Sequence, residues 1–224
     1  MALILNIDSA SENAHVSLAR EGQVLHTLTS GSQKEHAAFL QTAIHDLTKI
    51  TGIHLKEIDA VAVTAGPGSY TGLRVGMASA KGLCYALKIP FITISSLEVL
   101  TVSALQIYTE PQENILFCPM IDARRLEVFT AVYQHDLNIY LQPCAMILNE
   151  FSFEKELLNN KILFFGSGLE KWKNICTQPN ALFMSISTLP QSLSKLSNRL
   201  FLEKKFTDLA YSEPFYLKEF QIVI

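Results

Sequence analysis

The sequence predicts a two-lobed α/β protein in which each lobe is a mixed sheet flanked by helices. With 224 residues, the chain is long enough for one large domain or for two small lobes. Strand-like and helix-like runs follow one another in the order βββαβαβα, and this order occurs twice. Three meandering strands followed by helical crossovers are typical of a mixed sheet with helices on its faces.

The first lobe is expected to cover residues 1–109. The turn Glu21-Gly22 joins its second and third strands as a hairpin. Apolar alternation and periodicity predict strands at 2–8, 14–20, 23–29, 58–64 and 91–95, and helices at 35–51, 71–88 and 96–108.

The second, shorter lobe is expected to cover residues 110–224, after a polar, proline-containing stretch at 109–114. The two halves share the order of their elements without evident sequence identity. The expected strands are 115–122, 126–133, 139–147, 161–166 and 182–186, and the expected helices are 149–159, 168–175 and 190–205.

Composition narrows the class of protein. With 49% hydrophobic and 17% charged residues, the chain is globular rather than disordered. The net charge is −3, and consecutive basic residues occur only in pairs. Both observations argue against binding of nucleic acid by the chain alone. The four cysteines form no CxxC pair, which favours buried thiols in a reducing compartment. The start MALILNID lacks a basic region, and no run approaches the roughly 20 apolar residues of a membrane span, so we expect a cytoplasmic protein.

Duplicated lobes of this order resemble the actin, sugar-kinase and Hsp70 superfamily, which binds nucleotide between its lobes. Its phosphate loops are Asp-x-Gly turns after the first strand of each lobe. Here Asp8 is followed by Ser-Ala-Ser and Asp122 by Ala-Arg-Arg, so both turns lack the glycine. This departure argues against ATP hydrolysis by the chain alone. Gly166 could mark an adenosine-side turn, although a plain strand-to-helix turn is the simpler interpretation.

The stretch GPGSYTGLRVG at 66–76 raises the question of a phosphate loop. It lacks the lysine of a Walker loop, has Thr71 where a dinucleotide fingerprint needs glycine, and lacks the GxSxG spacing of a nucleophile elbow. Its amides could hold an anion at the start of the next helix, with an ordinary turn as the alternative. We expect any degenerate nucleotide or anion cleft to involve Asp8, Gly68, Ser69, Asp122, Arg124, Arg125 and Gly166.

Metal binding, cofactors and catalytic residues are not expected. His36 and His45 lie nine positions apart on the first predicted helix and therefore on opposite faces, since each residue turns the helix by ~100°. A helical metal pair would need histidine four positions after His36, where the sequence has Leu40.

The two helices at 35–51 and 71–88 carry more apolar surface than one sheet needs. Small residues at 72, 76, 80 and 84 predict a groove for another backbone, and Arg74, Lys81 and Lys88 form one polar stripe. We expect a subunit interface here; the alternative is a pair of buried crossover helices in a monomer. The expected interface residues are Ala37, Leu40, Ile44, Leu47, Gly72, Arg74, Gly76, Met77, Ala80, Lys81 and Cys84.

The run GPGSYTGLRVGMASAKGL closely resembles the signature of the TsaB (YeaZ) family, glycoprotease-like relatives of the TsaD transferase. The resemblance covers the first lobe well and weakens after about residue 135. Further matches are ILNIDSA near the start, EHAAFLQTAI at 35–44, IDARRLEVF at 121–129 and SEPFYLKEF at 212–220.

This resemblance implies a non-catalytic dimerisation and scaffold subunit that binds and activates TsaD in threonylcarbamoyladenosine (t6A) modification of tRNA. It further implies that the helices at 35–51 and 71–88 meet TsaD, or a second copy when the chain is alone. The ATPase TsaE would join through the complex, and tRNA would be contacted only indirectly. The residues leave two other functions open: an ATP-dependent phosphotransferase and, less in keeping with them, a glycoprotease-like metallopeptidase.

Overall fold

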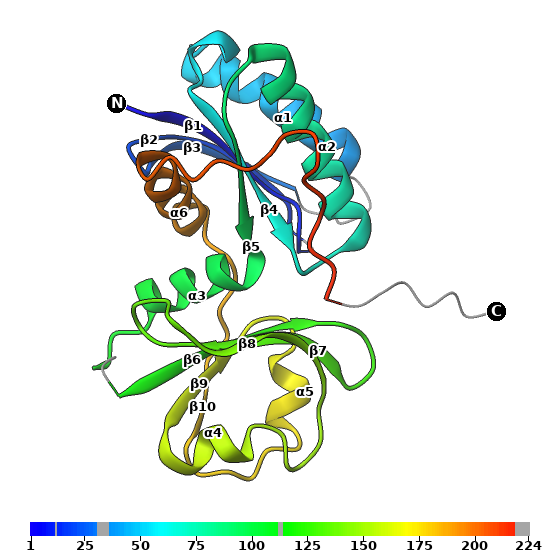
Figure 1. The fold of residues 1–224 in the computed structure, drawn as a ribbon, viewed down its shortest axis with the longest axis vertical. Coiled ribbons are helices and arrows are strands. Elements are labelled where there is room, and N and C mark those ends of the chain that lie inside the picture. Colours follow the sequence, from blue (N-terminus) through cyan, green and yellow to red (C-terminus); the bar gives the residue numbers. More distant parts are fainter. Residues whose placement is uncertain (12, 31–35, 112–113, 218–224) are drawn as a thin grey trace, which may run out of the picture. The chain divides into compact units, whose positions relative to one another are not determined.

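The computed structural model describes residues 1–11, 13–30, 36–111 and 114–217 and contains two five-stranded sheets (Figure 1). The strand orders are β3-β2-β1-β4-β5 and β8-β7-β6-β9-β10, so the two sheets have the same topology. This duplication confirms the predicted two-lobed, actin-like α/β fold. Within the described residues, every helix is too short or too polar to cross a membrane.

The first sheet combines an antiparallel meander with parallel crossovers. The meander pairs β1 with β2 and β2 with β3, whereas β4 and β5 run parallel to β1. In the β2–β3 turn, Glu21 and Gly22 both have positive φ, as a tight hairpin requires. The strands are β1 (Leu3–Asp8), β2 (His15–Arg20), β3 (Gln23–Thr29), β4 (Ala60–Gly66) and β5 (Phe91–Ser95).

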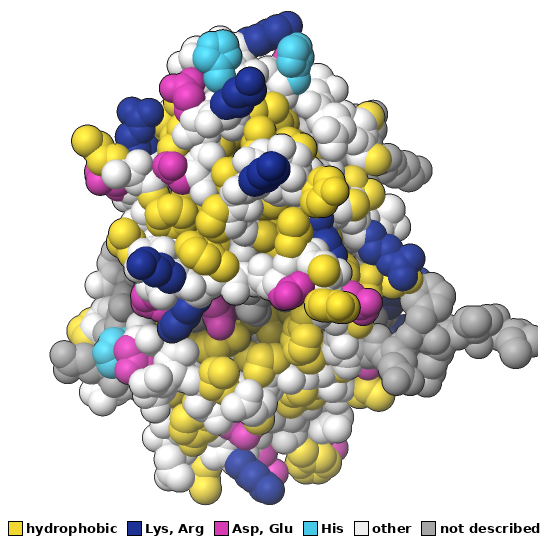
Figure 2. Space-filling view, turned by 45° about the horizontal axis from the view of Figure 1, so that its top comes forward, with side chains coloured by type: hydrophobic (Ala, Val, Ile, Leu, Met, Phe, Trp, Pro, Cys, Tyr) yellow, Lys and Arg dark blue, Asp and Glu magenta, His cyan; other side chains and the backbone are white. Residues whose placement is uncertain are grey.

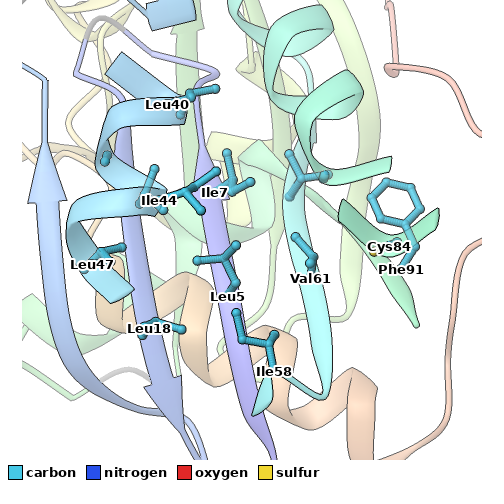
Figure 3. Close-up of a cluster of buried hydrophobic side chains, with 14 of the residues drawn as sticks. Leu5, Ile7, Leu18, Leu40, Ile44, Leu47, Ile58, Val61, Cys84 and Phe91 are labelled. Atoms are coloured by element: carbon cyan, nitrogen blue, oxygen red, sulfur yellow. The ribbon is translucent and has the colours of Figure 1, made fainter. Parts of the chain in front are cut away.

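Helices cover both faces of this sheet. On one face, α1 (His36–Thr51) and α2 (Tyr70–Leu87) pack over the alternate apolar residues of the strands, whereas α6 (Pro190–Leu202) packs on the other. Figure 3 shows Leu40, Ile44 and Leu47 of α1 directed toward Leu5 and Ile7 of β1. A short 3-10 turn, Leu55–Glu57, precedes β4. The predicted start of the first helix, residue 35, lies outside the described residues.

The second sheet is built from β6 (Ile115–Asp122), β7 (Glu127–Tyr133), β8 (Ile139–Ile147), β9 (Lys161–Phe165) and β10 (Ala181–Phe183). One face is covered by α4 (Glu154–Asn159) and α5 (Leu169–Lys173), whose fully buried Trp172 packs edge-on against Phe153 and Phe164. The opposite face receives α3 (Ser96–Ile107) through Leu100 and Ala104.

The boundary between the two compact units differs from the predicted one at 109/110. The first unit is Met1–Val99 with Leu189–Phe215, and the second is built on Leu100–Thr188. The last helix of each half packs on the sheet of the other half: α3 adds to the second core, and α6 packs on β1, β3 and β5 of the first sheet. Element order along the chain cannot reveal such an exchange, because it depends on which sheet face is still uncovered.

Candidate functional site

The glycine-rich loop joins β4 to α2 and is fastened to the turn after β1. Ser69 caps α2, because its Oγ accepts a hydrogen bond from the backbone N of Gly72 at 3.3 Å. The backbone N of Ser69 donates to the carbonyl oxygen of Ala10 at 2.7 Å. An amide that could have held an anion is therefore used inside the chain, as in an ordinary turn.

Three of the loop and helix glycines give room to the same turn. A Cβ atom at Gly68 would overlap the carbonyl oxygen of Ala10, and one at Gly72 or Gly76 would overlap Ser9. The Ser9 hydroxyl also donates to the carbonyl oxygen of Gly72 at 2.8 Å. The small residues thus make room for the turn after β1 of this chain. The sequence had led us to expect the backbone of a partner subunit there.

Asp8 is fully buried at the end of β1 and organises this turn. Its Oδ1 accepts hydrogen bonds from the backbone N of Ala10 at 3.0 Å and from Thr64 Oγ1 at 2.9 Å. Its Oδ2 lies 3.4 Å from Nε2 of His15, the residue directly opposite on β2. Burial alone would raise the pKa of Asp8, but the nearby His15 and the hydrogen bonds from Ala10 and Thr64 together hold that pKa below its usual value.

In the second unit, Asp122 occupies the equivalent position and is accessible. Its side chain is 45% exposed and accepts from Lys171 Nζ at 2.8 Å. Its Oδ1 also accepts from the backbone N of Arg124 at 2.6 Å, and its own backbone N donates to Ser167 Oγ at 3.0 Å. Asp122 is therefore part of a surface ion pair that tethers α5 to the β6–β7 turn.

The arginine pair and the second glycine turn complete this region. Arg124 and Arg125 are exposed and have positive φ values of 71° and 48°, which form the tight β6–β7 hairpin. Gly166 has a φ of 106°, and a Cβ there would overlap the carbonyl oxygen of Met120. These contacts show Gly166 packed as a strand-to-helix turn.

The seven expected cleft residues fall into two local sets. Asp8, Gly68 and Ser69 lie together in the first unit, and Asp122, Arg124, Arg125 and Gly166 lie together in the second. In the first unit the turn that would have to open around a phosphate is closed against α2. Over the part of the chain that is described, no three His, Cys, Asp or Glu side chains are grouped as metal ligands.

Most of the expected interface residues are buried in the first unit itself. The α1 residues face its own sheet, as Figure 3 shows, and the small α2 residues face β4 and the β1–β2 turn. In this structure these side chains are not available to a partner, because they pack inside the first unit. The buried members are Leu40, Ile44, Leu47, Gly72, Gly76, Met77, Ala80 and Cys84.

The other three expected interface residues reach the surface. Ala37 is exposed at the start of α1, and Arg74 is exposed on α2 with its guanidinium 4.1 Å from the ring centre of Tyr70. Lys81 is half-buried, since its Nζ donates to the carbonyl oxygens of Ala210 at 3.2 Å and Ser212 at 3.0 Å. The predicted polar stripe on α2 is therefore partly covered by the C-terminal segment.

A second face of the same two helices is exposed, and we name it the two-helix face. Gln41 Nε2 donates to Ser79 Oγ at 2.9 Å across its centre, and a Cβ at Gly82 would meet no heavy atom within 4 Å. Tyr85 is 79% exposed. Its uncharged members are Ala37, Ala38, Gln41 and Thr42 of α1 and Ala78, Gly82, Tyr85 and Ala86 of α2, and the exposed Arg74 and His45 lie one turn before Ala78 and one turn after Gln41.

Charge on the visible surface is dispersed. Figure 2 shows lysine and arginine side chains, single or in small groups, among acidic and apolar ones on the face in view. The net charge of the whole chain is −3.

Two features of this region were missed by sequence reasoning. The approach of Ser9 to the α2 glycines joins residues more than 60 positions apart, and no local pattern marks it. The second feature, the group of buried polar residues around Asp8, does leave a weak signal in the sequence. Asn6 and Asp8 interrupt an apolar strand at alternate positions, as His15 and Ser17 do on β2. The period of two places all four on the face of the sheet opposite the α1–α2 core.

Comparison with known proteins identifies the relatives. The TsaD family model, described as tRNA N6-adenosine threonylcarbamoyltransferase, matches residues 23–212. The Bacillus subtilis (strain 168) protein named tRNA threonylcarbamoyladenosine biosynthesis protein TsaB is 29% identical over 96% of this chain and 93% of its own length. The protein of the same name from Escherichia coli (strain K12) is 28% identical over 96% of this chain and 94% of its own.

Solved structures agree with these sequence relatives. A Pseudomonas aeruginosa protein described as similar to peptidase YEAZ gives a TM-score of 0.84 at 25% identity, covering 97% of this chain and 100% of that chain. YeaZ from Pseudomonas aeruginosa gives a TM-score of 0.80 at 24% identity with the same coverage, which shows the shared fold. The chain therefore belongs to the TsaD family and, within it, to the TsaB (YeaZ) group.

Proposed function

We propose that the protein is a non-catalytic scaffold subunit in the biosynthesis of threonylcarbamoyladenosine in tRNA, and that it binds and activates a TsaD transferase. The observation that carries the proposal is the two-helix face, an exposed surface of small residues that includes Tyr85 and is bordered by Arg74 and His45. Small side chains let two helix pairs approach closely, and an exposed aromatic side chain is a frequent anchor in protein interfaces.

The family relationship supports TsaD as the partner. The chain matches the TsaD family model over most of its length, so partner and subunit would carry comparable two-helix layers. Related subunits of one fold commonly pair through equivalent surfaces about a two-fold axis. A second copy of this chain could use the same face when TsaD is absent, and TsaE would join through the complex.

The buried Asp8 supports placing the chemistry on the partner. In this unit the carboxylate is occupied by Ala10 and Thr64, and the following turn is closed against Gly72. A group that must bind phosphate or a reacting atom has to reach it, and this one is 1% exposed. Contact with tRNA would be made through the partner, and the protein would work in the cytoplasm.

The substitution Gly82→Leu tests the proposal without touching the core. The side chain would enter open space on the two-helix face, and Leu is a better helix former than Gly, so the fold should persist. We expect co-purification with the TsaD of the same organism to be lost, with affinity reduced at least ~10-fold, or ~1.4 kcal/mol. By contrast, leucine at Gly76 or Ala80 would disturb the interior, because both face the core of this chain.

The matched control is Gln191→Leu, which adds an exposed leucine to α6 on the other face of the sheet. This variant should bind TsaD like the wild type. A folded Gly82→Leu protein that retains full binding would contradict the assignment of the two-helix face.

A further inference from the structure

The last part of the first unit is a strap that follows α6, residues 203–215, which runs along α2 in Figure 1. It begins where α6 ends at Leu202 and continues with little regular structure. Its backbone is held at separate points rather than by a continuous ladder. We call this segment the C-terminal strap.

The first attachment is at the edge of β5. The backbone N of Thr207 donates to the carbonyl oxygen of Phe91 at 2.8 Å, and the backbone N of Thr93 donates to Thr207 Oγ1 at 3.0 Å. These bonds cover the open edge of the first sheet, where unpaired strand groups would otherwise face solvent.

The second attachment is Lys81 on α2. Its ammonium group donates to the carbonyl oxygens of Ala210 and Ser212, which lie in a turn that Asp208 closes by accepting from the backbone N of Ala210 at 2.8 Å. Hydrogen bonds from a charged donor are stronger than neutral ones. A third attachment follows at the end of β4, where the backbone N of Phe215 donates to the carbonyl oxygen of Ala65 at 2.6 Å.

Few strap side chains contribute to the core. Leu209 packs against it, whereas Phe206, Tyr211 and Phe215 are 44%, 87% and 48% exposed. Leu209 also lines an apolar hollow of about 560 Å³ with Cys84 and Ile89. Segments with few buried apolar contacts and isolated backbone bonds are those that open locally before the rest of a domain unfolds.

We propose that the C-terminal strap opens as a unit while the remainder of the first unit stays folded, and that Lys81 holds it closed. Opening withdraws Leu209 and uncovers Cys84, which is 1% exposed in the closed form. Because the strap lies along α2, its position sets how much apolar surface of that helix faces a protein partner. Only this last consequence rests on the proposed function; the opening itself rests on the contacts above.

The wild-type protein alone provides the first test, by native-state hydrogen exchange. The amides of Thr207 and Phe215 should exchange together, at least ~100-fold faster than those of Val61 and Val63 in β4, which lies between β1 and β5, since strap opening leaves β4 intact. Equal opening free energies for the strap and β4 would overturn the proposal, because the strap would then open only on global unfolding.

The second test is alkylation of Cys84 with iodoacetamide, read by peptide mapping. In the closed form burial raises the pKa of the Cys84 thiol to about 11, so labelling needs opening. Lys81→Met should accelerate labelling about 10-fold through loss of charged hydrogen bonds, and Lys81→Arg should restore part of the protection. Lys49→Met, a matched exposed lysine on α1, should change nothing.

Cys118, fully buried in the second unit, reports unfolding that includes that unit, and the amides of Val61 and Val63 in β4 report unfolding of the first unit. A Lys81→Met protein that labels Cys84 at the wild-type rate would overturn the role of Lys81. Equal acceleration at Cys118 would also overturn it, because the variant would then be unfolding globally. None of these readouts uses TsaD, so failure of the strap and failure of the proposed function are distinguishable.

Discussion

The turns after β1 and β6 hold equivalent places in the two sheets but have opposite environments. Asp8 is buried, accepts from Thr64 and Ala10, and fixes a turn against α2. Asp122 is exposed, pairs with Lys171, and precedes two arginines in a tight hairpin. One topology has thus given a structural anchor in the first unit and a surface ion pair in the second.

The difference depends on what faces each turn. In the first unit Gly72 and Gly76 leave space on α2 that Ser9 fills. In the second unit the facing helix, α5, has five residues, and it contributes the Lys171 side chain instead. Gly68, Gly72 and Gly76 of the glycine signature therefore serve an intramolecular contact, whereas Gly82 lies on the two-helix face, on the other side of α2.

The largest expected loss of stability comes from filling the space beside Gly72 that Ser9 occupies. Gly72→Ala places a methyl group on the carbonyl oxygen of Ser9, which is backbone and cannot rotate away, so we expect a loss of about 3 kcal/mol in the free energy of unfolding. Gly82→Ala, on the same helix in open space, should instead gain up to ~1 kcal/mol. Urea denaturation gives the free energy of unfolding of both variants. Equal changes in the two would show that the turn does not restrict α2.

The second comparison sets the two aspartates against each other. Asp8→Asn removes a buried charged acceptor and should cost about 2 kcal/mol, whereas Asp122→Asn on the surface should cost about 0.5 kcal/mol or less. Chemical denaturation at neutral pH gives both values. A larger loss at Asp122 would reverse the assignment of anchor and surface pair.

A smaller effect is expected in the pH dependence of the free energy of unfolding. The folded pKa of Asp8 lies below its unfolded value, so its contribution is fully present above about pH 4 and disappears as pH falls through the lower, folded value. Wild-type stability should therefore decline more steeply below about pH 4 than that of Asp8→Asn. Parallel curves for the two proteins, measured by urea unfolding at several pH values, would contradict a charged Asp8 in the native state.

Much of the fold could be predicted because it depends on local patterns. The strands 23–29, 91–95, 115–122 and 139–147 have the predicted bounds, since alternation and turn residues mark both ends. The fourth helix begins at Glu154 rather than 149, after turns at 150–153, and the last ends at Leu202 rather than 205. The exchange of α3 and α6 between the units was not predictable, because it is decided by long-range packing.

The helices α1 and α2 could be predicted from the sequence, but the face that each one turns toward its own sheet could not. Periodicity selected α1 and α2 as helices with more apolar surface than one sheet needs, yet it could not say which face of α2 would meet its own chain. Ser9 decides this for Gly72 and Gly76, and the C-terminal strap decides it for Lys81. Both segments are remote in sequence from α2, so the sequence of the helix alone does not indicate either contact.

Site-specific photo-crosslinking tests most directly the claim that a partner binds the exposed side of α2. A photoreactive benzoylphenylalanine replaces Tyr85, which is 79% exposed on that face, or Tyr140, which is 47% exposed in the second unit and serves as the aromatic control. With TsaD present, we predict a crosslink to TsaD from position 85 and none from position 140. A TsaD crosslink from position 140 with none from position 85 would contradict the claim.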